Sequence, residues 1–105
     1  MVLPEGLIAY HHRGGRMEGD LGETRPGWFQ LWALGDIESL NTSYEVQKNL
    51  PGFTGIGSNG GGELLAVSPT GRVVAIPSIG MEAKEAVVVA ESWDALEKHI
   101  GAHVA

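Results

Sequence analysis

The sequence predicts an α+β fold in which a mostly antiparallel sheet of four to five strands is flanked by helices. Short apolar runs separated by turn residues fill the stretch 52–91, and they are typical of consecutive strands. Apolar residues at helical spacing mark the segments 36–49 and 92–100. The length of 105 residues suits one domain spanning 1–105.

The first third of the chain predicts a helix, a loop and a strand. Residues 4–12 begin with Pro and Glu, which suit a first helical turn, and the glycines after Arg13 end the helix. The glycine-rich stretch 14–27 is expected to be loop. The run WFQLWAL at 28–34 predicts a strand with Trp28, Gln30 and Trp32 on one face and with Phe29 and Leu31 on the other.

The rest of the chain predicts two helices and four strands. Asp36 is expected to cap a helix over 36–49. Strands follow at 52–57, 63–68, 72–77 and 85–91, and the turn SPTG joins the middle two into a hairpin. Ser92 is expected to cap a final helix that ends at Gly101. We expect the helices to pack on one face of the sheet.

The composition narrows the range of functions. The chain has no cysteine, which excludes disulfides and a cysteine nucleophile, and its formal charge is −6. Seven scattered basic residues disfavour nucleic-acid binding, whereas an acidic surface attracts basic partners. The sequence shows neither a secretory signal nor an apolar run long enough to cross a membrane, so we expect a cytoplasmic protein without membrane contact.

The stretch GIGSNGGGE at 55–63 has the GxGxxG spacing of dinucleotide-binding loops. Such a loop needs a helix after it, because the N-terminal amides of that helix bind the pyrophosphate. Here ELLAV follows and predicts a strand, so a hairpin turn is the better interpretation, with Asn59-Gly60 at positive-φ positions. In that turn Glu63 is expected to accept hydrogen bonds from the loop amides. Binding of a nucleotide or another small ligand by this loop stays as an alternative.

No pattern for catalysis is evident, and we expect neither an enzyme nor a cofactor. His99 and His103 are one helical turn apart, but no third metal ligand accompanies them. No serine lies in a GxSxG motif. The tryptophans are more informative, because one face of the strand 28–34 must either be covered by the loop 14–27 or be exposed as an interface.

Four segments of the chain resemble the SUKH superfamily, over about Leu3 to Ile100. They are LPEG followed by GG, then QLWALGDIESLNTSYEV, then LPGFTGIGSNGGGELLAV, and finally RVVAIPSIGMEAKEAVVVAESWDALEKHI. The superfamily contains fungal cell-wall-assembly regulators and bacterial toxin-immunity proteins, and its fold is α+β. Members usually carry a helix before the LPEG-like segment, whereas here only two residues precede it, so we expect a shortened N-terminus.

The resemblance implies protein binding without catalysis. Bacterial members typically occlude the active site of a toxin, often a basic nuclease. The family's glycine segment matches a fold-defining loop here: Gly55, Gly57, Gly60, Gly61, Gly62 and Glu63. We expect Trp28, Trp32 and Tyr44 to anchor such a partner and Glu18, Asp20 and Glu23 to steer it. A homodimer without a toxin partner is a further alternative.

Overall fold

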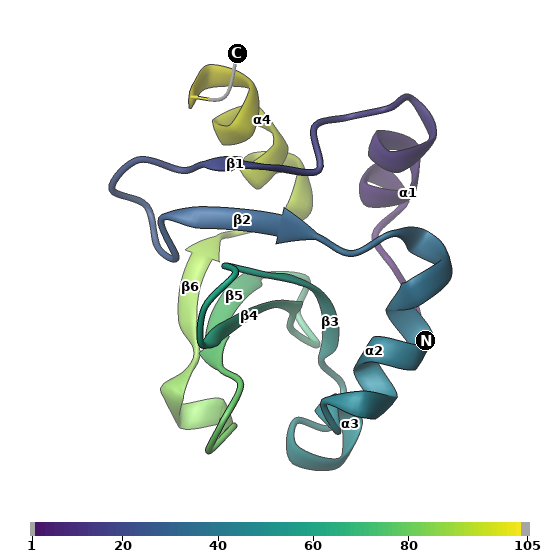
Figure 1. Ribbon diagram of the computed structural model, residues 1–105, viewed down its shortest axis with the longest axis vertical. Helices are drawn as coiled ribbons and strands as arrows, with labels where there is room; N and C mark the ends of the chain where they lie inside the picture. Colours follow the sequence, from purple (N-terminus) through teal and green to yellow (C-terminus); the bar gives the residue numbers. More distant parts are fainter. Residues whose placement is uncertain (1, 104–105) are drawn as a thin grey trace.

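A computed structural model describes residues 2–103 of the chain and contains one six-stranded antiparallel sheet (Figure 1). The strands are hydrogen-bonded in chain order: β1 (Glu18–Asp20), β2 (Trp28–Leu31), β3 (Thr54–Ser58), β4 (Glu63–Val67), β5 (Val73–Pro77) and β6 (Val87–Ala90). The helices are α1 (Glu5–His12), α2 (Ile37–Ser43), α3 (Val46–Asn49) and α4 (Trp93–His103), with 3-10 turns η1 (Leu34–Asp36) and η2 (Ala83–Glu85). The α+β prediction is confirmed.

The sheet has six strands, and the prediction of four to five is therefore too low. The additional strand, β1, lies in the stretch 14–27 that the sequence predicts as loop. It pairs antiparallel with β2, with Gly19 opposite Phe29. Only three residues long and without an apolar alternation, β1 has no strand signal of its own and forms because β2 offers an open edge.

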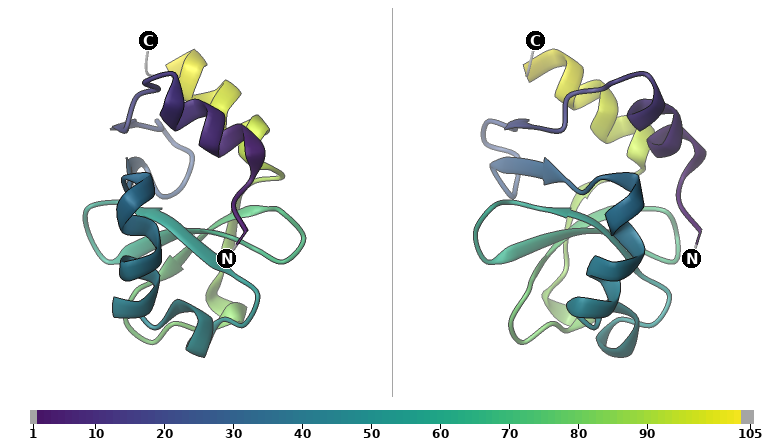
Figure 2. Two further views of the ribbon diagram at one scale, coloured as in Figure 1. Left: turned by 90° about the vertical axis from the view of Figure 1, so that its right-hand side faces the viewer. Right: turned by 45° about the vertical axis from the view of Figure 1, so that its right-hand side comes forward.

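Helices cover both faces of the sheet, so the expectation of one covered face is wrong. On one face α1 and α4 lie side by side (Figure 2), and they enclose a core that includes Leu65 of β4. On the opposite face α2 and α3 pack, and a second cluster includes the adjacent Leu64. Successive side chains of a strand point to opposite faces of the sheet. Because β4 and β5 are buried on both faces, nearly all of their residues are apolar.

The predicted helix 36–49 is interrupted. After η1, α2 ends at Ser43, and Glu45 adopts a left-handed conformation with φ of 56° before α3 begins. The side chain of Asp36 makes no capping hydrogen bond, so the predicted cap is wrong. The interruption turns the chain so that Val46 and Leu50 reach the second cluster.

The remaining boundaries differ from the predictions by a few residues. The strand predicted at 28–34 ends at Leu31, and the strand predicted at 52–57 lies at Thr54–Ser58. The hairpin 63–77 is confirmed, with Leu65 opposite Ala75. Ser92 Oγ accepts a hydrogen bond from the amide of Ala95, as expected of a cap, but α4 continues past Gly101 to His103. No helix within residues 2–103 is long and apolar enough to cross a membrane.

Candidate interaction surface

The glycine-rich segment 55–63 divides between a strand and a turn. Gly55 and Gly57 lie in β3, where a bulge separates them. A Cβ atom on Gly57 would overlap the backbone oxygen of Gln30 in the neighbouring strand, and one on Gly55 would come within 3.0 Å of the Trp32 ring. These two glycines therefore allow β3 to pack closely against Gln30 of β2 and against Trp32, which follows it.

Side chains of the turn itself satisfy several of its amides. Asn59 Oδ1 accepts hydrogen bonds from the amides of Gly61 (2.9 Å) and Glu63 (3.1 Å), and Ser58 Oγ accepts one from Gly60 (3.2 Å). Gly60 has a φ of 75°, as predicted, but Asn59 does not have a positive φ, so the prediction for the Asn59-Gly60 pair is wrong at Asn59. The sequence assigned the acceptor role to Glu63, and that assignment is wrong because Asn59 fills it.

Glu63 instead ties the turn to the segment before β2. Its carboxylate forms a salt bridge with Arg25 and lies 3.4 Å from Asn59 Nδ2. Nothing in the sequence links Arg25 to Glu63, since they are far apart in the chain and meet only when β2 and β3 pair with their neighbours. The strand β4, and not a helix, follows the turn, as predicted.

Asn41 is a fully buried polar residue that the sequence analysis did not identify. Its Nδ2 donates to the backbone oxygens of Ile37 (2.8 Å) and Gly55 (2.9 Å). Its Oδ1 accepts from the Gly55 amide (2.7 Å) and from Gln47 Nε2 (3.0 Å). Two of these four hydrogen bonds, both with Gly55, hold α2 against β3, and the other two connect Asn41 to Ile37 of α2 and to Gln47 of α3. No local pattern signals this role.

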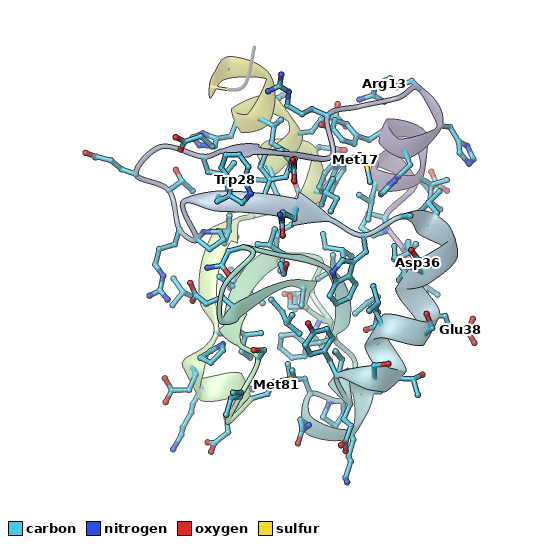
Figure 3. All side chains as sticks on the ribbon, in the orientation of Figure 1. Arg13, Met17, Trp28, Asp36, Glu38 and Met81 are labelled. Carbon is cyan, nitrogen blue, oxygen red and sulfur yellow. The ribbon has the colours of Figure 1, made fainter. Side chains whose placement is uncertain are left out.

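The tryptophans of the β2 region lie as the predicted alternation requires. Phe29 and Leu31 are buried in the core under α1 and α4, whereas Trp28 is 40% exposed on the outer face of β2 (Figure 3). Trp32 follows β2, is partly buried and stacks on Tyr44. Trp28 and Trp32 are four residues apart, or roughly 13 Å along an extended chain. The structure therefore brings Trp32 and Tyr44 together and leaves Trp28 separate.

The pairing of β1 with β2 places two acidic residues of β1 close to Trp28. Asp20 lies opposite Trp28, and Glu18 lies opposite Gln30 and accepts a hydrogen bond from its side chain (3.3 Å). Directly opposite residues of an antiparallel pair point to the same face. We call the resulting surface the acidic ribbon face and define it by four residues: Glu18, Asp20, Trp28 and Gln30.

The acids of this region lack cationic partners. Within the described part of the chain, neither Glu18 nor Asp20 forms a salt bridge, and the same holds for Glu23, which is exposed in the connection between β1 and β2. Asp20 Oδ1 accepts only the amide of Gly22, at 2.6 Å. The negative charge of the acidic ribbon face is therefore available to an external cation.

Other polar clusters provide no comparable arrangement. Across residues 2–103, no three His, Asp or Glu side chains converge closely enough to hold a metal ion. His99 Nε2 lies 3.1 Å from the Leu21 oxygen, and the side chain of His103 lies outside the described part. On α1, burial lowers the pKa of His11, and the adjacent His12 lowers it further.

One cavity of the described structure lies away from the predicted site. It measures about 660 Å³ and lies between α2, α3 and the start of β3, with Glu38, Thr42 and Phe53 in its lining. None of the aromatic or acidic residues selected from the sequence lines it. The candidate site thus lies outside this cavity, on an exposed face of the sheet.

Comparison with known proteins leaves the family of the chain open. No family model matches the sequence, and no curated protein is significantly similar to it.

Proposed function

We propose that this chain is a non-catalytic protein-binding domain of the SUKH type, which acts in the cytoplasm as an immunity protein by covering the surface of a toxin. The observation that carries the proposal is the acidic ribbon face, where exposed Trp28 lies beside Asp20 and the carboxylate of Glu18. Its four side chains lie on adjacent strands of a sheet, a support that keeps their geometry constant when a partner binds.

The chemistry of the acidic ribbon face suits a basic protein partner. An exposed indole supplies a large, rigid contact, and tryptophan is enriched among residues that dominate binding energy. Carboxylates without internal cationic partners raise the rate of association with a basic surface. Glu23, close in sequence to Asp20, adds to the same negative field.

The stacked pair of Trp32 and Tyr44 has a different part in this proposal. Trp32 already packs against the second apolar cluster, so its contribution to binding is largely to hold Tyr44 in place. Tyr44 is 40% exposed and extends the aromatic surface beyond the acidic ribbon face.

The turn at 58–63 gives no support to nucleotide binding. Phosphate recognition by a glycine loop needs free amides that point at the anion. Here the amides of Gly60, Gly61 and Glu63 already have acceptors in Ser58 and Asn59. We therefore do not propose a ligand for this turn.

Affinity capture from native lysate tests the proposal. Tagged protein should retain a stoichiometric basic protein at low salt and release it at about 0.5 M salt, because added ions screen exposed charges. Trp28→Ala should weaken capture by about 2 kcal/mol, and Glu18→Lys with Asp20→Lys should abolish it.

A charge-matched control separates the acidic ribbon face from net charge. Glu38→Lys with Glu82→Lys changes the net charge equally at exposed positions on other elements, and it should leave capture intact. Self-association without a partner, measured by light scattering, would instead support the homodimer. Equal loss in both double variants would reject the acidic ribbon face as the binding surface.

A further inference from the structure

The two edges of the sheet differ in how they are protected against pairing with another chain. The β1 edge is only three residues long and carries exposed Glu18 and Asp20. Short length and charge are the features by which natural proteins block edge pairing. The β6 edge is only one residue longer, but it lacks the charge, because Val87–Ala90 contains only apolar residues and Val88 is 49% exposed.

The outer edge of β6 has no strand beside it. Within residues 2–103, β6 pairs only with β5, and Figure 1 shows it below β2 on the left, beside β5. Apart from the bonds within the sheet, the four residues Val87–Ala90 form no backbone hydrogen bonds with the rest of the described chain. An edge strand presents a row of backbone N–H and C=O groups that an extended chain can pair with.

Charge at the two ends of β6 selects against a second copy of the same chain. Exposed Glu85 and Glu91 each lie three residues from Val88. Glu85 ends the 3-10 turn η2 before β6, and Glu91 directly follows the strand. In a two-fold antiparallel pair centred on Val88, the Glu85 end of one copy would therefore lie beside the Glu91 end of the other. Like charges placed directly opposite each other destabilise a pair of strands.

We propose that the β6 edge binds an extended segment of a partner protein by strand addition, and that this segment carries Lys or Arg at both ends of a short apolar run. The basic ends would pair with Glu85 and Glu91. Glu91 already contacts Arg72 at 2.7 Å, but both side chains are more than half exposed, and such surface pairs exchange partners at little cost. The proposal concerns a surface other than the acidic ribbon face and does not depend on it.

A synthetic peptide tests this surface directly. Acetyl-KTVTVTK-amide has the same spacing between its lysines as Glu85 and Glu91 have in the chain, and its threonines and valines favour a strand. We expect it to bind in fluorescence anisotropy and to slow amide hydrogen exchange in Val87–Ala90. The glutamate analogue, acetyl-ETVTVTE-amide, should bind about tenfold more weakly, since its charges repel the ends of the strand. A lysine peptide with N-methylated valines should not bind, because it cannot complete the backbone ladder.

Matched variants of the protein distinguish strand addition from general attraction. Val88→Lys places a lysine on the edge and should abolish peptide binding, whereas Ile79→Lys alters a 91% exposed aliphatic residue in a loop and should leave binding unchanged. Glu85→Lys with Glu91→Lys should reverse the preference toward the glutamate peptide.

Three results would overturn the proposal. One is the absence of exchange protection in Val87–Ala90 at about 1 mM lysine peptide, a concentration that detects even weak binding. Another is equal binding of the N-methylated peptide, which would show attraction by charge alone. The third is a dimer, detected by light scattering, in which Val87–Ala90 is protected from exchange without any peptide. That result would show that a second copy of the chain occupies the edge.

Discussion

The ring of Trp32 is stacked on the ring of Tyr44, with centroids 5.7 Å apart and planes inclined by 7°. The stack joins the end of β2 to the break between α2 and α3. Trp32 also lies against Gly55 of β3, so the pair spans three parts of the fold. This position makes Trp32 a structural residue as well as a candidate for binding.

We expect the stack to contribute to stability. Trp32→Ala should destabilise the fold by about 3 kcal/mol, whereas Trp28→Ala, at an exposed position, should change stability by less than about 0.5 kcal/mol. Urea unfolding measures both values. In a double-mutant cycle, Trp32→Ala and Tyr44→Ala should couple by about 1 kcal/mol, and strict additivity would show that the stack contributes nothing.

Gly57 is expected to be the least replaceable glycine of the 55–63 segment. Gly57→Ala should destabilise the protein by about 2 kcal/mol, because the new methyl group overlaps the backbone of Gln30 and β2 must move. Gly62→Ala is the matched control, since a Cβ there meets nothing within 4 Å. Thermal or urea unfolding of the two variants checks the difference, and equal midpoints would contradict the close approach of β2 and β3.

Loss of the Asn41 side chain should leave buried polar groups without partners. We expect Asn41→Ala to cost about 3 kcal/mol of unfolding free energy, because Gly55 loses the partner of both its N–H and its C=O. Thr42→Ala removes only one exposed hydrogen bond, to Glu38, and should cost less than about 0.5 kcal/mol. Similar losses in the two variants would indicate that β3 does not depend on Asn41.

The cap of α4 provides a prediction of helix stability. Ser92→Ala removes the acceptor for the Ala95 amide and should destabilise the protein by about 1 kcal/mol, while Ser92→Asp should retain most of the stability. Chemical denaturation is the measurement. An unchanged midpoint in Ser92→Ala would mean that α4 holds its first turn without this hydrogen bond.

Stability should also depend on the protonation of His11. Because burial lowers its pKa in the folded state, the unfolded chain binds the proton more tightly. The contribution of His11 is therefore fully present above its ordinary pKa of about 6.5 and is lost as the pH falls through the lower value of the folded state.

Unfolding free energies measured between pH 7.5 and 5 check this dependence. The variant His11→Gln should lose less stability than the parent over this range. His12→Gln should keep most of the loss, because burial is the larger of the two causes of the shift. An identical pH dependence in the parent and in His11→Gln would contradict the assignment.

The parts of the fold that sequence predicted well are those with local signals. The β4–β5 hairpin has two apolar runs around a turn that contains Pro69 and Gly71, and α4 has a serine cap before an apolar stripe. By contrast, the break at Glu45 has no such signal, since a left-handed glutamate is not a local preference and the packing of Val46 and Leu50 beyond it favours the break.

The residues of the candidate site could be selected from the sequence, but their grouping in space could not be predicted from it. Trp28 and the acids before it stand out in the sequence, but the prediction grouped Trp28 with Trp32 and Tyr44. The structure groups it with Glu18 and Asp20, because a strand forms where a loop was expected. Asn41 was missed altogether, since a polar residue on a short helix gives no indication that it will be buried.

The sequence by itself determined the α+β class, the order of most elements and the turn that joins β3 to β4. These features depend on residue size, polarity and backbone freedom, which act over a few neighbouring positions. Only the tertiary structure decided that β1 completes the sheet, that helices cover both faces and that Asp20 lies beside Trp28. Such features arise from pairing between segments that are distant in the chain. The contacts that stabilise them form only when both segments are already in place.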